Sequence, residues 1–154
     1  MNKMYRFSYK INNAIVDPDK IREIEEFFQD DYAFENGSPL SFQNVTFVVN
    51  DSKSENVTHL IDINLSLDVY DPRGDYIYSY FLEAKLFALK LSKALTRGSV
   101  ELYFIGDDIT DSWGLEIEPG IVYRMYIDWQ IDDEVKPIDL SKEELLKAVG
   151  YIKA

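Results

Sequence analysis

The chain has 154 residues, of which 46% are hydrophobic and 29% charged, a balance typical of one folded domain spanning 1–154. It contains no cysteine, which excludes disulfides, thiolate nucleophiles and cysteine-ligated zinc. Its net charge of −12 repels phosphate backbones and anionic lipids, so we expect no direct nucleic-acid binding and no membrane binding.

The first elements are a strand over residues 3–10 and a helix that begins after Asp17. Asp is a favoured N-cap, and Pro18 suits the first helical position because its missing N–H would be unsatisfied there. Four apolar residues then share one helix face: Ile21, Ile24, Phe27 and Phe28. We expect this helix to end near residues 31–32.

Strands are predicted over residues 41–50 and 57–70, joined by a polar turn. In the second strand, apolar residues from Ile61 to Val69 alternate with polar ones, which places them on one buried face. Residues 76–81 are rich in strand-forming side chains and favour a third antiparallel strand, although a helix beginning near Tyr76 is an alternative.

The second half of the chain begins with a helix over residues 84–97, which we expect Gly98 to end. A strand over 99–105 follows, and then a hairpin of 115–118 and 121–131 across Pro119 and Gly120. Ser141 and Glu144 have the spacing of a capping box, which predicts a short final helix.

Together these elements predict an α+β fold in the order β-α-βββ-α-βββ-α. We expect antiparallel sheet of about six to seven strands, packed by the central helix and flanked by the two others. The residues predicted to be largely buried are Ile63, Leu65, Leu67, Leu86, Leu89 and Leu95.

The most informative feature is an acidic stretch over residues 101–134. It contains ten acids and one base, a net charge of −9, with tryptophans and tyrosines between the acids. Aromatic anchors surrounded by acids are typical of a surface that binds a basic protein, because the anchors supply affinity and the charges steer association. The candidate partner-binding residues are Asp107, Asp108, Asp111, Trp113, Glu116, Glu118, Tyr126 and Asp128. The alternative is that the aromatic residues belong to the core and the acids only face water.

Catalytic motifs are weak in this sequence. Asp107, Asp108 and Asp111 could hold a divalent cation, but their spacing does not fit the EF-hand loop. His59, the single histidine, belongs to no recognisable catalytic triad and is expected to be structural or solvated. We expect no cofactor.

These patterns favour a small, acidic, non-enzymatic protein that neutralises a basic partner protein. A toxin-neutralising immunity protein and an inhibitor of a nucleic-acid enzyme would both fit. The alternatives are a carboxylate-dependent metal enzyme and a structural or assembly subunit. The N-terminus has no secretory signal pattern and no stretch approaches a membrane helix, so we expect a cytoplasmic protein.

Overall fold

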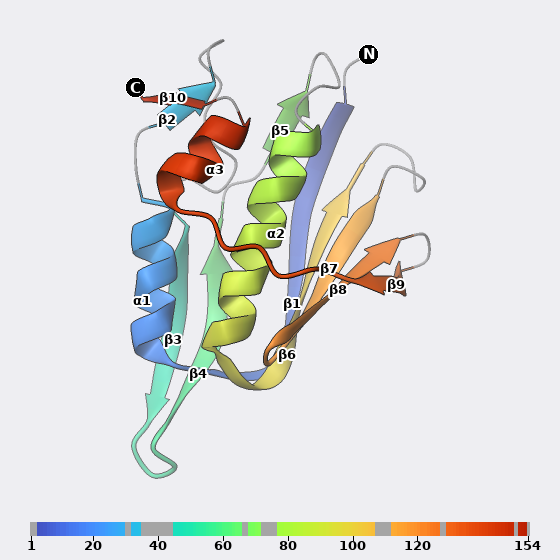
Figure 1. Cartoon of the computed structure of the whole chain (residues 1–154). Helices are drawn as coiled ribbons and strands as arrows, with labels where there is room; N and C mark the ends of the chain where they lie inside the picture. Colours follow the sequence, from blue (N-terminus) through green and yellow to red (C-terminus); the bar gives the residue numbers. More distant parts are fainter. Residues whose placement is uncertain are drawn as a thin grey trace.

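The computed structural model describes residues 3–29, 32–34, 45–65, 68–71, 77–106, 112–126, 129–149 and 151–153. Within these ranges the fold is α+β, with three helices, an eight-stranded antiparallel sheet and a separate two-stranded pair (Figure 1). The elements in chain order are β1 (Lys3–Val16), α1 (Pro18–Phe27), β2 (Tyr32–Phe34), β3 (Thr46–Ser52), β4 (Val57–Asn64), β5 (Asp68–Asp71), α2 (Ile77–Ala94), β6 (Leu95–Ile105), β7 (Trp113–Glu118), β8 (Ile121–Tyr126), β9 (Gln130–Glu134), α3 (Lys142–Val149) and β10 (Tyr151–Lys153).

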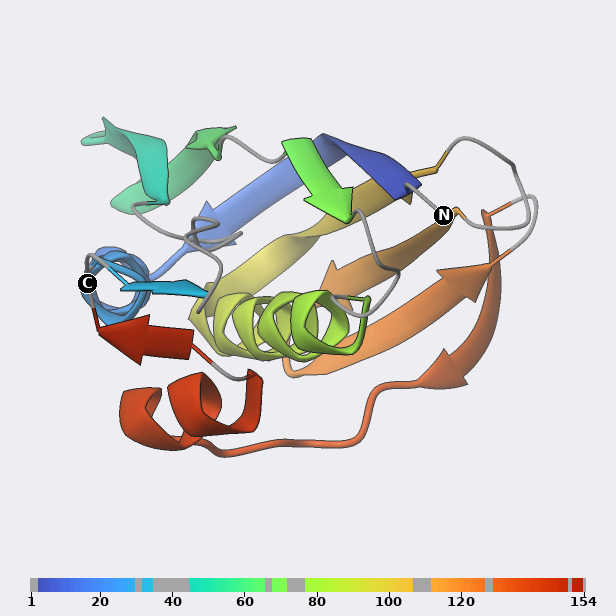
Figure 2. The same ribbon diagram turned by 90° about the horizontal axis from the view of Figure 1, so that it is seen from above.

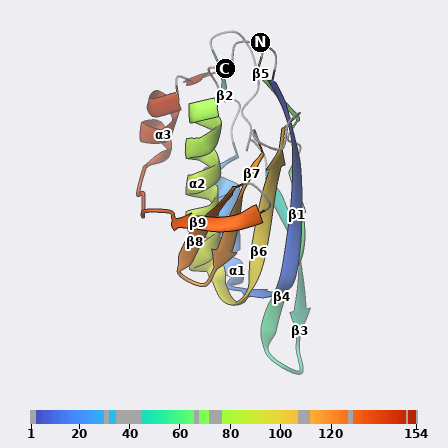
Figure 3. The same cartoon turned by 90° about the vertical axis from the view of Figure 1, so that its right-hand side faces the viewer.

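The large sheet has the strand order β3-β4-β1-β6-β7-β8-β9, and β5 pairs with the beginning of β1. Strands β2 and β10 form the separate pair. The three helices lie on one face of the large sheet (Figures 2 and 3). Helix α2 contacts α1, α3 and strands β6 to β8, so the main core lies between this helix and the middle of the sheet.

Strict alternation in β6 and β7 creates this core. Val100, Leu102 and Phe104 of β6 are fully buried, and Leu102 pairs directly with Leu115 of β7. Since neighbouring strand residues point to opposite faces, residues between the buried ones must point away from the helices. Glu101 is one of them.

Helix α1 begins as predicted. The side chain of Asp17 accepts a hydrogen bond from the backbone N–H of Asp19 at 3.0 Å, and Pro18 occupies the first turn. Ile21, Ile24 and Phe28 are buried. The helix ends at Phe27, a few residues earlier than expected, and Phe28 forms its C-cap.

Helix α2 differs from the prediction at both ends. It begins at Ile77, so the strand predicted over 76–81 is wrong from Ile77 onward and the helical alternative holds. It ends at Ala94, and Gly98 lies inside β6 instead of terminating the helix. Gly98 has a φ of +79°, and a Cβ atom there would lie 2.2 Å from the carbonyl oxygen of Asn13. A glycine is needed because β1 bulges against this position.

A bulge in β4 also shifts the alternation of inward-facing and outward-facing residues along this strand. Val48 of β3 pairs with Asp62 and Val49 pairs with Leu60, so Ile61 is the extra residue and is 51% exposed. The single buried face predicted from Ile61 onward is therefore wrong at that residue.

Most of the predicted core is confirmed. Ile63, Leu86, Leu89 and Leu95 are buried, and Leu65 is half-buried. Leu67 lies outside the described residues.

The C-terminal hairpin forms across Pro119 and Gly120 as predicted, with Glu118 paired to Ile121. The expected long strand over 121–131 is instead two strands, β8 and β9, that pair with each other. Trp129 precedes β9 with a φ of +57°, a conformation suited to a turn and not to a continuous strand.

The predicted capping box begins α3. The backbone N–H of Glu144 donates to the hydroxyl of Ser141, and the N–H of Ser141 donates to the Glu144 carboxylate, both at 3.2 Å.

Candidate functional site

The face of the sheet opposite the helices gathers acidic and aromatic side chains from β6, β7 and β8. In these strands Glu101 pairs with Glu116, which pairs in turn with Tyr123. Tyr103 pairs with Gly114, which pairs in turn with Met125. The acidic and aromatic part of this open face, with its neighbours, comprises Glu101, Tyr103, Gly114, Glu116, Glu118, Tyr123, Met125 and Trp129. Lys10 of β1 pairs with Glu101 on the same face.

Three carboxylates of the open face lie close together. Glu101 and Glu116 occupy directly opposite positions, and Glu118 follows two residues after Glu116 on the same face. All three are half-buried. Burial, followed by the charges of Glu118 and Glu101, raises the pKa of Glu116 above its ordinary value. Like charges directly opposite on paired strands destabilise a sheet, and Lys10 of β1, which pairs with Glu101 from the other side, offsets part of this repulsion.

Glu101 has hydrogen-bond partners on the same face. The side-chain amide of Asn12 on β1 donates to its carboxylate at 3.0 Å and also to the hydroxyl of Ser99 at 3.2 Å. Burial, then a hydrogen bond with Glu101 and the charges of Glu101 and Glu116, raises the pKa of Tyr103 to about 12. The Tyr103 hydroxyl therefore stays protonated at neutral pH beside the carboxylates.

An aromatic cluster lies beside the acids. The rings of Tyr103 and Trp129 meet edge to face with centroids 4.7 Å apart. Gly114 lies beneath this cluster and leaves no room for a side chain, because a Cβ atom there would lie 2.6 Å from the carbonyl oxygen of Leu102 and 3.1 Å from Cε of Met125. Met125 is buried, whereas Trp129 is 37% exposed. Trp129 thus offers a large aromatic surface at the edge of the carboxylate group.

Two of the predicted contact residues lie away from this face. Trp113 is only 2% exposed and stacks on Phe104 with ring centroids 4.2 Å apart. It belongs to the core between sheet and helices and offers no exposed anchor. Tyr126 is half-buried on the helix-covered side, where Arg124 donates a hydrogen bond to its hydroxyl. Strand alternation therefore separates these two aromatic residues from Glu116 and Glu118.

The remaining predicted contacts, Asp107, Asp108, Asp111 and Asp128, lie outside the described residues. His59 lies on β4 with Nε2 3.9 Å from a carboxylate oxygen of Glu55. Within the described ranges, no group of three or more histidine, cysteine, aspartate or glutamate residues is placed to hold a metal ion.

Glu101 belonged to the acidic stretch, but neither Glu101, Tyr103 nor Trp129 was among the predicted contacts. One signal was present in the sequence. Between Val100 and Phe104, apolar residues alternate with Glu101 and Tyr103, which places these two together on the polar face of a strand. Only the pairing of β6 with β7 brings them beside Glu116.

The chain matches no protein-family model, no curated protein and no solved structure. Over the described part of the chain, none of the helices combines the length and apolar character needed to cross a bilayer.

Proposed function

We propose that this chain is a non-enzymatic binding protein that neutralises a basic partner protein through the open face of its sheet. The observation that supports this most strongly is the direct pairing of Glu101 with Glu116, both half-buried beside Tyr103. Opposed carboxylates destabilise a sheet, and Lys10 of β1 pairs with Glu101 but with neither Glu116 nor Glu118. Departures from good local design of this kind are expected at functional sites.

A basic partner would relieve this repulsion. A lysine or arginine side chain placed between Glu101 and Glu116 would compensate both charges, and an arginine could also stack on the exposed ring of Trp129. The protein's net charge of −12 would accelerate the encounter with a positively charged surface. A cytoplasmic immunity protein or an inhibitor of a nucleic-acid enzyme would act in this way.

The experiment is a pull-down from the native cytosol at low and high salt, comparing the wild type with two charge-reversed proteins. One carries Glu116→Lys and Glu118→Lys. The control carries Glu26→Lys on α1 and Glu55→Lys in the β3–β4 turn, both exposed positions outside the open face. A partner captured by the wild type and the control but lost with the open-face variant supports the proposal. Equal capture by both variants would contradict it.

The competing function is a carboxylate-dependent metal enzyme that uses Asp107, Asp108 and Asp111. A ligand that binds only the folded state raises its stability by mass action. The binding proposal expects thermal stability to be the same with Mg²⁺, Mn²⁺ or Ca²⁺ as with a monovalent salt of equal ionic strength. A saturable increase that is lost on changing the three aspartates to asparagine would favour the metal enzyme.

A further inference from the structure

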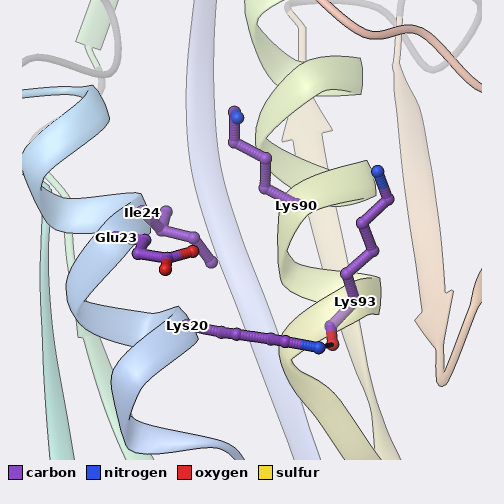
Figure 4. Close-up of a pocket in the computed structure, with 5 residues that line it drawn as sticks. All are labelled: Lys20, Glu23, Ile24, Lys90 and Lys93. Carbon is purple, nitrogen blue, oxygen red and sulfur yellow. Dashed lines mark hydrogen bonds between the residues drawn. The ribbon is translucent and has the colours of Figure 1, made fainter.

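A second feature lies on the helical side of the molecule, in a groove between α1 and α2 (Figure 4). The groove has a volume of about 300 Å³ and is lined by Lys20, Glu23, Ile24, Lys90 and Lys93. Small-molecule sites begin at roughly this size. Three lysines around one groove contrast with the overall charge of −12.

The lysines come from both helices. Lys20 crosses from α1 to α2, where its ammonium group lies 3.3 Å from the backbone carbonyl oxygen of Lys93 (Figure 4). Lys90 and Lys93 extend from positions three residues apart on α2, with their ammonium groups apart from that of Lys20, and Glu23 points towards α2 from α1 (Figure 4). Ile24, which is 2% exposed, provides an apolar wall.

Lys90 is held in a defined position. Its ammonium group lies 4.0 Å from the centroid of the Phe27 ring, a cation–π contact. Burial lowers the pKa of Lys90, whereas the nearby carboxylates of Asp139 and Glu23 act in the opposite direction. A partly desolvated ammonium group interacts more strongly with an anion than a fully hydrated one does.

Helix capping does not account for this arrangement. Cations near the end of a helix can compensate its unpaired carbonyl groups. In α2, however, other donors already reach the last carbonyls. The backbone N–H of Gly120 donates to the carbonyl oxygen of Ser92 at 3.0 Å, and that of Asp17 donates to the carbonyl oxygen of Ala94 at 2.9 Å. The ammonium group of Lys20 donates a hydrogen bond to the carbonyl oxygen of Lys93. The ammonium groups of Lys90 and Lys93 are not needed for this purpose.

We propose that the α1–α2 groove binds the phosphate group of a small molecule. Lysine binds phosphate as a flexible point charge, and three ammonium groups opposed by the carboxylates of Glu23 and Asp139 leave a local excess of positive charge that suits an anion. The apolar wall at Ile24 would take the organic part of the ligand. This site is independent of the open face, which lies across the sheet from the helices.

The test is a titration of the whole protein with inorganic phosphate and with glycerol 3-phosphate, followed by amide chemical shifts at constant ionic strength. Sodium chloride serves as the reference, because phosphate also stabilises proteins without binding to a site. We expect saturable shifts in α1 and in the last turns of α2 with both phosphates, and tighter binding of the ester. Losing one charged hydrogen-bond partner should weaken binding by about tenfold.

The variants are Lys93→Gln and Lys90→Met, which keeps an aliphatic chain over Phe27. Lys53→Gln, at an exposed position in the β3–β4 turn, is the control. We expect both groove variants to lose about tenfold in affinity and the control to stay within twofold. If Lys90→Met does not fold, Lys20→Gln replaces it, since Lys20 is exposed. Shifts that do not saturate, or equal losses in Lys53→Gln and Lys93→Gln, would overturn the proposal, as would failure of the ester to bind.

Discussion

Replacing Glu116 by glutamine should make the free protein more stable and its complex weaker. Glu116 lies opposite Glu101 on the neighbouring strand and two residues before Glu118. The substitution removes one negative charge from this group and keeps the size of the side chain. Opposite effects on stability and binding are the expected signature of a site in which repulsion is maintained for function.

The size of the stabilisation follows from the geometry. Directly paired strand residues place their carboxylates roughly 6 Å apart. At that distance two unit charges repel by ~0.7 kcal/mol in water. Glu118 adds a smaller contribution, so we expect a total increase of about 1 kcal/mol in the free energy of unfolding at pH 7.

The pH dependence provides a second check. Because the pKa of Glu116 is raised in the folded protein, the folded state binds its proton more tightly than the unfolded state does. The free energy of unfolding therefore falls as the pH rises through the ordinary glutamate pKa towards the raised value. Above the raised value, the ionised Glu116 destabilises the folded protein by its full amount. Below the ordinary pKa the wild type is protonated in both states, and the advantage of Glu116→Gln should disappear.

Urea denaturation of both proteins at about pH 7 and about pH 3.5 measures this difference. Glu26→Gln, at an exposed position on α1, is the matched control and should change stability by less than ~0.5 kcal/mol. The reasoning is refuted if Glu116→Gln is no more stable than the wild type at neutral pH. It is also refuted if the advantage is unchanged in acid.

Three further substitutions test other parts of the structure. Trp113→Ala should cost about 3–5 kcal/mol in the free energy of unfolding, measured by urea denaturation, because this residue is 2% exposed; a loss below about 1 kcal/mol would show that it is not a core residue. Gly98→Ala should destabilise more than Gly120→Ala, because both have positive φ but only the first Cβ would collide with the carbonyl oxygen of Asn13; equal melting temperatures would contradict the bulge. His59→Gln should leave partner affinity within about twofold, as measured by titration calorimetry, whereas a hundredfold loss would place His59 in the site.

Local patterns in the sequence were sufficient for elements with their own signals. The N-cap at Asp17, the capping box at Ser141 and the turn at Pro119 were all predicted, because each depends on residues only a few positions apart. The buried positions of α2 could also be predicted from the sequence, since the apolar face of this helix is wide. Ile77 was assigned to a strand because aromatic and β-branched residues favour both a strand and a buried helix start.

The open face could not be predicted because it depends on pairing between strands. The acidic stretch over 101–134 is not one surface, because strand alternation divides it between two faces of the sheet. Trp113 consequently lies in the core, and Trp129 reaches the acids only because the chain turns between β8 and β9. Likewise, the bulge that turns Ile61 outward is a property of its register with Val48 and Val49.

The measurement that tests the central claim most directly is the affinity of the purified basic partner for two charge-reversed variants, at two ionic strengths. Glu116→Lys with Glu118→Lys is compared with Glu26→Lys with Glu55→Lys, since both pairs change the net charge from −12 to −8. Long-range attraction should fall equally in the two proteins, but contact at the open face is lost only in the first. We predict that the open-face variant binds at least about tenfold more weakly than the control at low salt, with the difference persisting at high salt. Equal affinities of the two variants would contradict the proposal that the open face is the binding surface.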